Sequence, residues 1–288
     1  MLGLACGDAL GSTIEFTRRD SHPEVCDLIG GGPFQLEPGQ WTDDTSMALC
    51  LAGSLIACHG FDADDLLKRF VAWWRDGTNS VTGHCFDIGN TTQSSLYEYE
   101  ATRLLIAGPD DDHQAGNGSL MRMAPVAIFA GGDSDEAERL AMLQSQTTHP
   151  APVAHEACRL FARKLTMALN GATKDEVMKP ADWTGSAEIT GIAACGYRRK
   201  SRRDISSSGY VVHTLEAAMW AIDKSETLED AVILAANLGD DSDTVGAVTG
   251  ALAGAIWGVQ SIPDRWLAKL AWREHLVERV DALILHKA

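Results

Sequence analysis

The stretch that decides the fold is "NLGDDSDTVGAVTGALAGAIWG", residues 237–258 of a 288-residue chain. After Asp243 it is apolar on every side, but it is shorter than the ~20 apolar residues that span a membrane, so it predicts a buried central helix. Four glycines recur in it at four-residue spacing: Gly246, Gly250, Gly254 and Gly258. Because each glycine costs a helix up to about 1 kcal/mol, this stripe predicts that a neighbouring helix backbone approaches closely.

A second stretch, "GLACGDALGSTIEF" at residues 3–16, has the same character. Gly3, Gly7 and Gly11 fall on one helical stripe, and Glu15 stands at the end of the segment, just before Phe16. This pattern predicts a closely packed helix that delivers a carboxylate at its end.

The remaining chain is also patterned for helices. Apolar residues recur at three- and four-residue spacing, and alternating strand patterns are scarce. Proline- or serine-rich linkers that would divide the chain are missing. We therefore predict an all-α fold of ten or more helices, forming one domain over residues 1–288. Further helical patterns cover residues 43–60, 62–77, 152–171, 214–223 and 227–239.

Composition limits the partners. The formal net charge of -16 argues against a nucleic acid or an anionic membrane, because binding phosphates requires an excess of Lys and Arg. The seven cysteines form no Cys-x-x-Cys pair and are odd in number, so they predict reduced thiols in a cytoplasmic protein. Gly and Asp interrupt the opening residues too early for a signal peptide. We expect a monomer.

Acidic residues cluster twice at predicted helix starts, in "QWTDDTS" (40–46) and "LGDDSDT" (238–244). A carboxylate at a helix N-terminus is favoured by the dipole and can cap it, but capping explains one Asp and not several. The extra carboxylates repel one another unless a cation lies between them. Carboxylate and hydroxyl oxygens without nearby Cys or His favour Mg²⁺ or Mn²⁺ over zinc. Each cluster alone is typical of a solvent-exposed helix cap. The two clusters together predict a shared metal site.

Seven motifs, in order along nearly the whole chain, resemble the ADP-ribosylglycohydrolases, the family that includes the dinitrogenase-reductase-activating glycohydrolase and crystallin-like relatives. The resemblance implies an all-α enzyme in which two Mg²⁺ or Mn²⁺ ions support removal of ADP-ribose from a modified protein side chain. The motifs are "GLACGDALGSTIEF", "WTDDTSMAL", "CFDIGNTT", "GNGSLMRMAPVA", "THPAPVAHEA", "SSGYVVHTLEAAMWA" and "NLGDDSDTVGAVTGALAGAIWG".

The same resemblance implies the metal ligands and the catalytic residues. Two ions polarise the ribose hydroxyls and lower the pKa of a water, and neighbouring carboxylates stabilise positive charge on the ribose. Glu15 is the expected general base or water-positioning residue, and Asp43 and Asp44 are catalytic through the metals. The implied metal ligands are Thr42, Asp43, Asp44, Asp241, Asp243 and Thr244.

Other motifs are expected to bind the ligand. "AGNGSLMR" (115–122) is a Gly/Asn loop that runs into a helix, where backbone N–H groups can bind a diphosphate; taken alone, it reads as a turn. By the resemblance, His149 contacts ADP-ribose, and Asp87 and Asn90 contact the scissile ribose and the acceptor. The expected substrate-binding residues are thus Asp87, Asn90, Gly116, Asn117, Gly118, Ser119, Met121 and His149.

The acceptor stays open at this point. "CFDIGNTT" is similar to the arginine-directed bacterial branch, and Asp87 offers a partner for a planar guanidinium, so we favour N-linked ADP-ribosyl-arginine. The alternatives are O-linked ADP-ribosyl-serine, a small ADP-ribosylated metabolite, a metal-dependent phosphohydrolase, and a non-catalytic crystallin-like protein that binds ADP-ribose.

Overall fold

The computed structural model describes residues 1–106, 108, 110–111 and 115–285, and their regular structure is helical. Within these residues the β pairing consists of two isolated bridges, Gly31 with Leu36 and Gly116 with Tyr210. The predicted all-α fold is therefore confirmed.

The α-helices are α1 (Leu2–Gly11), α2 (Asp43–Cys58), α3 (Ala63–Asp76), α4 (Asn90–Thr102), α5 (Gly118–Met121), α6 (Ala124–Ala130), α7 (Ser134–Gln146), α8 (Pro152–Leu169), α9 (Lys174–Val177), α10 (Ala187–Ala193), α11 (Val211–Lys224), α12 (Leu228–Ala236), α13 (Ser242–Trp257), α14 (Asp264–Lys269) and α15 (Arg273–Leu285). Short 3-10 helices are η1 (Ser12–Ile14), η3 (Gly196–Arg199), η4 (Arg202–Asp204) and η5 (Val259–Ser261).

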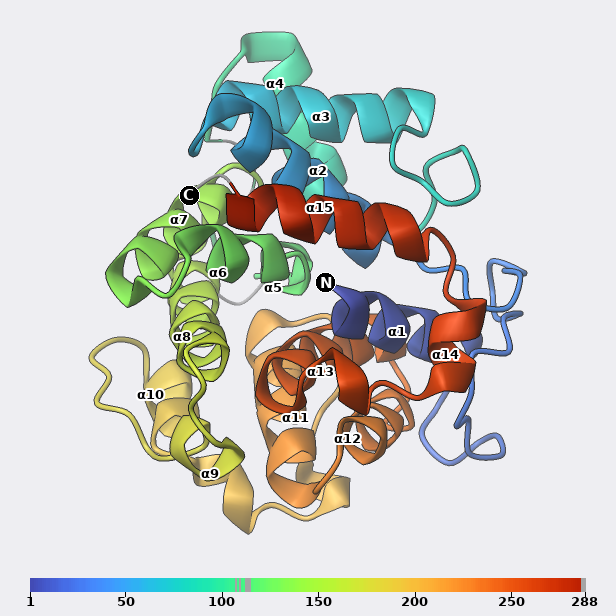
Figure 1. Ribbon diagram of the computed structural model, residues 1–288. Coiled ribbons are helices and arrows are strands. Elements are labelled where there is room, and N and C mark those ends of the chain that lie inside the picture. Colours follow the sequence, from blue (N-terminus) through green and yellow to red (C-terminus); the bar gives the residue numbers. More distant parts are fainter. Residues whose placement is uncertain (107, 109, 112–114, 286–288) are drawn as a thin grey trace.

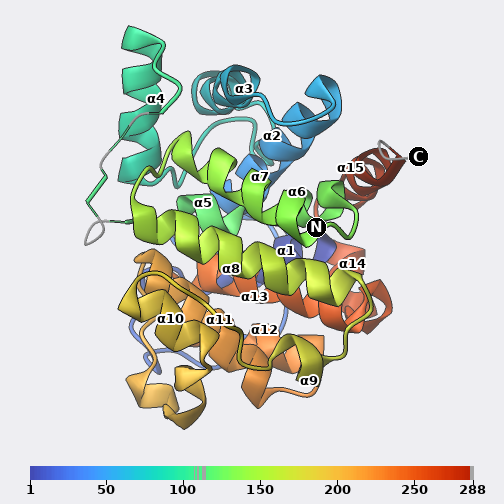
Figure 2. The same ribbon diagram turned by 90° about the vertical axis from the view of Figure 1, so that its left-hand side faces the viewer.

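Two helices from opposite ends of the sequence form the centre of the molecule. α1 and α13 lie side by side, with α2, α3 and α4 toward one end of the molecule and α10, α11 and α12 toward the other (Figures 1 and 2). α8 runs between these two groups of helices (Figure 2). Both central helices are apolar on nearly all sides, as a helix surrounded by protein must be.

Glycines allow these two backbones to touch. A Cβ atom at Gly7 would lie 2.0 Å from the carbonyl oxygen of Gly246, and one at Gly3 would lie 2.2 Å from that of Gly250. At Gly11 it would lie 2.2 Å from the carbonyl oxygen of Ser242. These distances leave no room for any side chain, so the expectation that glycine stripes mark a close helix contact is confirmed.

The stripe on α13 ends earlier than its spacing suggests. A Cβ at Gly254 would be in ordinary contact, 3.6 Å from the Cα of Gly3. Gly258 follows the helix as its C-cap, with a positive φ of 79°, which glycine adopts without steric cost. Only Gly246 and Gly250 are therefore pressed against α1.

The outer helices follow the amphipathic pattern. In α3 the buried positions Leu66, Leu67, Phe70 and Trp73 form one apolar face. Asp62 caps its N-terminus by accepting the N–H of Asp65, and the chain leaves the helix through left-handed Gly77. Across the described residues, we find no helix with the length and apolarity to cross a membrane.

We predict that Gly7→Ala lowers the free energy of unfolding by about 3 kcal/mol or more, because the new methyl group meets the backbone of α13. Chemical denaturation followed by circular dichroism measures this loss. The matched control is Gly254→Ala on the same interface, where a Cβ fits and alanine improves helix propensity by up to about 1 kcal/mol. Equal losses in the two variants would contradict this account of the contact.

Candidate active site

The first turn of α2 is capped from another helix. Thr42 is the N-cap residue, but its side chain makes no capping hydrogen bond. Asp8 of α1 supplies the cap: its Oδ1 accepts the N–H of Thr42 at 2.8 Å and its Oδ2 accepts the N–H of Thr45 at 3.0 Å. The hydroxyls of both threonines donate to the same carboxylate. The side chains of Asp43 and Asp44 are therefore not needed as caps.

The first turn of α13 is capped in the same way. Oε2 of Glu15, the residue after η1, accepts the N–H groups of Ser242 and Asp243 at 2.8 and 3.2 Å. It also accepts the hydroxyl of Ser242 at 3.1 Å. The N-terminal segment of the chain thus caps both helix starts. Oδ1 of Asp243 accepts the N–H of Thr244 at 2.7 Å, so Oδ2 is the Asp243 oxygen left for another role.

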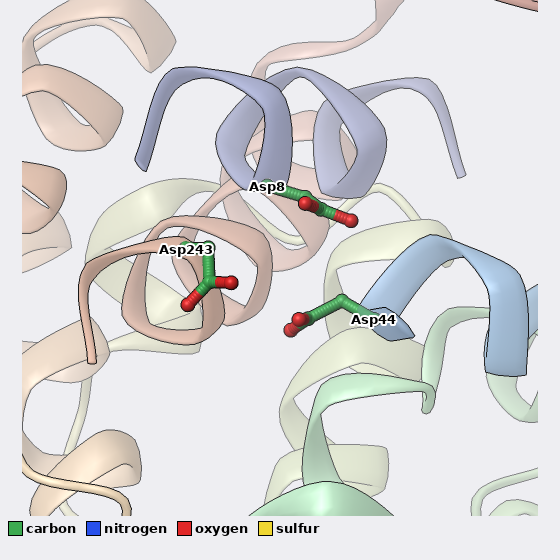
Figure 3. Close-up of side chains that lie close together, drawn as sticks. All are labelled: Asp8, Asp44 and Asp243. Carbon is green, nitrogen blue, oxygen red and sulfur yellow. The ribbon is translucent and has the colours of Figure 1, made fainter. Parts of the chain in front are cut away.

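The polar side chains at the starts of α2 and α13 lie close to one another. The hydroxyl of Thr42 lies 3.2 Å from Oδ2 of Asp44 and 3.1 Å from Oδ2 of Asp243. That of Thr244 lies 3.4 Å from the same Asp44 oxygen. Figure 3 shows the carboxylates of Asp8, Asp44 and Asp243 directed toward one another from α1, α2 and α13. The two acidic clusters of the sequence therefore form one group.

Carboxylate oxygens here are close enough to share a cation. Among the residues that the structure describes, three sets of three carboxylates have oxygens within 4.8 Å of one another. Every set contains Asp243: with Asp8 and Asp44, with Glu15 and Asp241, and with Asp43 and Asp87. Oδ1 of Asp44 is buried and has no hydrogen-bond partner among the described residues. A buried carboxylate oxygen without a donor is costly, and a divalent cation would satisfy it.

Burial and mutual repulsion raise the pKa values of these groups. Burial, followed by the charge of Asp243, raises the pKa of Asp8 to about 7 and that of Asp241 to about 7. Burial and the charge of Asp43 raise the pKa of Asp87 to about 11. Burial likewise holds the pKa values of Asp43 and Asp44 well above their usual range. Without a cation the group holds extra protons; positive charge placed among these oxygens would release them.

The acidic group forms one wall of a cavity of about 500 Å³. The opposite walls come from the start of α4, the loop before α5, and His149. Phe16, Asp87 and Asp240 at this cavity all have a left-handed backbone, with φ of 60°, 59° and 66°. Such strain in non-glycine residues is uncommon and concentrates at functional sites.

Most of the residues expected from sequence meet in this cavity. Thr42 and Asp44 lie just behind its wall, in contact with Asp243 and Thr244. Ser119 lies elsewhere: its hydroxyl contacts Ser145 and Cys158 in the buried interior. The predicted residues that line the cavity are Glu15, Asp43, Asp87, Asn90, Gly116, Asn117, Gly118, Met121, His149, Asp241, Asp243 and Thr244.

The loop before α5 is tied to the chain that precedes α11. The N–H of Asn117 donates to the carbonyl of Gly209 at 3.1 Å, so it is not available to a ligand. The Asn117 side chain donates to Asp241 and to Thr214. Asn117 therefore orients a predicted metal ligand, whereas Gly116 and Gly118 present bare backbone to the cavity.

Asp8 was not among the residues expected from sequence, although a signal for it exists. It is the one charged residue within the otherwise apolar helix "LGLACGDALG". A carboxylate at such a position must be satisfied by protein donors or by a cation, which marks it for attention. Its partners are Thr42, the N-cap residue of α2, and Thr45 within α2, which lie 34 and 37 positions away in the sequence.

The fold and the cavity define an all-helical protein with a cluster of carboxylate and hydroxyl oxygens at the starts of two helices. The family model for ADP-ribosylglycohydrolase matches residues 1–288. The chain belongs to this family, which confirms the predicted enzyme class, an ADP-ribosylglycohydrolase.

Relatives agree in sequence and in structure. The chain is 45% identical to the ADP-ribosylarginine hydrolase Tri1 of Pseudomonas putida (strain GB-1), over 100% of this chain and 81% of the relative. It is 42% identical to the protein of the same name from Serratia proteamaculans (strain 568), over 98% and 77%. A solved structure titled ADP-ribosylglycohydrolase-related protein complex matches with a TM-score of 0.87 and 39% identity, over 100% of this chain and 96% of that chain.

We predict that Mn²⁺ stabilises the EDTA-treated protein more at pH 8 than at pH 5.5. Asp8 and Asp241 ionise less readily in the folded protein than in the unfolded chain, because their pKa values are raised to about 7. In the metal-free protein their contribution to the free energy of unfolding is therefore full below about pH 4 and is lost as the pH rises through about 7. Mn²⁺ at about 100 times its Kd should restore ~2.7 kcal/mol, or roughly 5 °C in Tm, once protons compete less.

Thermal unfolding with and without Mn²⁺ measures this difference at each pH. Asp243→Ala is the control, since Asp243 belongs to every carboxylate set, and it should abolish the shift. A shift of the same size at both pH values would show that the metal binds away from these carboxylates.

Proposed function

We propose that this protein hydrolyses the N-glycosidic bond between ADP-ribose and an arginine side chain of a modified protein, with two Mg²⁺ or Mn²⁺ ions as cofactors. The observation that carries the proposal is the convergence of two helix starts, capped by Asp8 and Glu15, on one acidic cavity. The two Tri1 relatives, named as ADP-ribosylarginine hydrolases, support the choice of linkage.

The proposed metal ligands supply oxygen atoms only. When bound, the ions would polarise the ribose hydroxyls and lower the pKa of a water molecule. The unpartnered Oδ1 of Asp44 and the shared position of Asp243 support this assignment. The proposed ligands are Thr42, Asp43, Asp44, Asp241, Asp243 and Thr244.

Glu15 caps α13 through one carboxylate oxygen and is proposed to act on the attacking water through the other. Its Oε2 is engaged by the first turn of α13, so Oε1 is the atom that would orient the attacking water or take its proton. Burial, followed by the charge of Asp243, raises the Glu15 pKa far above its usual range. Bound cations would lower it again, which would leave Glu15 as a carboxylate that can take a proton. The carboxylates around it would stabilise positive charge at the ribose carbon as the bond breaks.

Asp87 is proposed to bind the leaving group. Its side chain is partly buried at the cavity beside Asp43 and Asp243, and burial in this acidic surrounding raises its pKa to about 11. A planar guanidinium would offset that repulsion and pair with both carboxylate oxygens, which a serine hydroxyl cannot do. Asn90, Gly116, Gly118, Met121 and His149, which also line the cavity, are proposed to contact the ADP-ribosyl group.

The proposed location is the cytoplasm and the proposed state is a monomer. All seven cysteines are free, and four of them, Cys6, Cys50, Cys158 and Cys195, are buried, which suits a reducing compartment. Size-exclusion chromatography with light scattering tests the monomer.

The decisive assay incubates the protein with ADP-ribosyl-arginine and ADP-ribosyl-serine peptides, with Mn²⁺ or with EDTA. Release of free ADP-ribose from the arginine peptide, dependent on metal, is expected. Faster release from the serine peptide would overturn the linkage, and AMP or phosphate as product would indicate a phosphohydrolase. Binding of ADP-ribose without turnover would indicate a non-catalytic, crystallin-like protein.

We predict that Asp43→Ala, Asp44→Ala and Asp243→Ala each abolish turnover, because each removes a charged ligand from the proposed metal pair. The fold should persist, since removing one carboxylate relieves repulsion in the metal-free protein. Release of ADP-ribose measures turnover, and circular dichroism measures the fold. Loss of helical signal in all three variants would assign the cluster a structural role instead.

We predict that Asp87→Asn lowers kcat/KM for ADP-ribosyl-arginine peptides by more than about tenfold, or ~1.4 kcal/mol, because the amide keeps the shape of Asp87 but cannot ionise to pair with the guanidinium. Asp87 belongs to one carboxylate set with Asp43 and Asp243, but it is not among the six proposed ligands, so Mn²⁺ affinity should change little. An Asp87→Asn variant that no longer binds Mn²⁺ would place this residue in the metal centre.

A further inference from the structure

Arg122, at the end of α5, is a cation in the interior of the protein. Its side chain is completely buried, and its guanidinium carbon lies 4.5 Å from the ring centre of Phe70. Among the described residues no carboxylate forms an ion pair with it, and Nη1 has no hydrogen-bond partner. Burial lowers its pKa to about 9, so it still carries a charge at neutral pH. An unpaired buried charge is costly and calls for a role.

The remaining donors of Arg122 point to the end of α7 and the turn after it. Nε donates to the side-chain oxygen of Gln144 at 2.7 Å, and Nη2 donates to the Gln144 carbonyl at 2.9 Å. Nη2 also donates to the hydroxyl oxygen of Thr148 at 2.9 Å, and more weakly to that of Thr147 at 3.5 Å. Arg122 therefore holds the segment that carries His149.

Thr148 connects Arg122 to His149. Its hydroxyl oxygen lies 2.8 Å from Nδ1 of His149, and within the described chain the hydroxyl makes no hydrogen bond other than those to Nδ1 and Arg122. A guanidinium can only donate, so the Thr148 oxygen is an acceptor there. Its own hydrogen then has Nδ1 as its acceptor, which requires Nδ1 to be unprotonated.

The other imidazole nitrogen is next to the cavity. A Cβ atom at Gly116 would lie 3.3 Å from Nε2 of His149, and one at Gly118 would lie 3.1 Å from it. Because both positions are glycine, the space beside Nε2 is open, and all three residues line the cavity.

We propose that Arg122 and Thr148 are positioning residues that hold His149 in the neutral tautomer with hydrogen on Nε2, so that Nε2–H is donated to an anionic or hydroxyl oxygen of the ADP-ribosyl group. The inference rests on the proposed function for the identity of the ligand. The direction of the hydrogen-bond chain does not depend on it: Arg122 donates to Thr148, Thr148 donates to His149, and His149 donates to the cavity.

The charge state of His149 agrees with this arrangement. Burial and the nearby Arg122 guanidinium lower its pKa to about 3, so the ring is neutral at the pH of a cell. A neutral imidazole donates from one nitrogen only. The hydrogen bond from Thr148 decides which nitrogen that is.

The first test is nitrogen NMR of the whole protein labelled with ¹⁵N-histidine, with His149→Gln used to assign the signals. We expect His149 to show a pyridine-like Nδ1 and a pyrrole-like Nε2, unchanged between pH 6 and pH 8. In Thr148→Val the ring should become a mixture of tautomers or reverse them. The opposite tautomer in the wild type, or an unchanged pattern in Thr148→Val, would overturn the inference.

The second test is the affinity for ADP-ribose, measured by calorimetry with Mn²⁺ present. We expect Thr148→Val to raise Kd about tenfold, and Thr148→Ser, which keeps the hydroxyl, to stay within about twofold of the wild type. The matched control is Thr147→Val: Thr147 is equally buried and is also reached by Arg122, but its hydroxyl donates to the Gln144 carbonyl and does not contact His149. It should change neither the tautomer nor Kd.

The outcomes separate the two proposals. A wild-type protein that shows the expected tautomer but does not bind ADP-ribose would contradict the proposed function and not the hydrogen-bond chain. If Thr147→Val weakens binding as much as Thr148→Val, the segment acts through packing and the inference is wrong. Thermal unfolding of each variant shows whether it folds. If Thr148→Val does not fold, Thr148→Ser is the test: a changed tautomer or a Kd raised by much more than about twofold would contradict the inference.

Discussion

The contact between the backbones of α1 and α13 is the constraint on which the site depends. With Gly7 against Gly246 and Gly11 against Ser242, the two helices cannot slide or rotate without a clash of main-chain atoms. The contact places Asp8 beside the first turn of α2 and Glu15 beside the first turn of α13. Each of these carboxylates satisfies backbone N–H groups that would otherwise need the local acids. Close packing at the centre thus leaves Asp43, Asp44 and Oδ2 of Asp243 without a capping role.

The buried carboxylates at the cavity repel one another, and the helix dipoles offset only part of that repulsion. The dipoles of α2 and α13 favour negative charge at their N-termini, but that effect is worth about 0.3 to 2 kcal/mol for each charge. It cannot balance several buried carboxylates with raised pKa values. The protein therefore either binds protons at these oxygens or binds cations, and the donor set favours hard divalent ions.

The sequence predicted the helices and much of the site because both leave local patterns. The starts of α2 and α13 were visible as acid clusters, and the glycine stripe gave the central contact. What the sequence could not provide was the partner of each polar group. Asp8 looked like part of an apolar helix, and Ser119 looked like part of a ligand loop although its hydroxyl faces the interior. Both errors concern contacts between residues at least 25 positions apart, which spacing along the chain does not reveal.

Two buried groups of opposite charge have different surroundings. The acids line the cavity, whereas Arg122 is buried behind it and is connected to it through Thr148 and His149. The acids face one another across a short distance, so a mobile cation can neutralise them and take part in chemistry. Arg122 faces neutral acceptors, Gln144, Thr147 and Thr148, so its charge is not neutralised and instead polarises their hydrogen bonds. A ligand with a diphosphate on one side and a cationic leaving group on the other would meet donors near His149 and carboxylates near Asp87. Donors beside His149 and carboxylates beside Asp87 would thus orient the ligand of the proposed function, although the protein as a whole is strongly acidic.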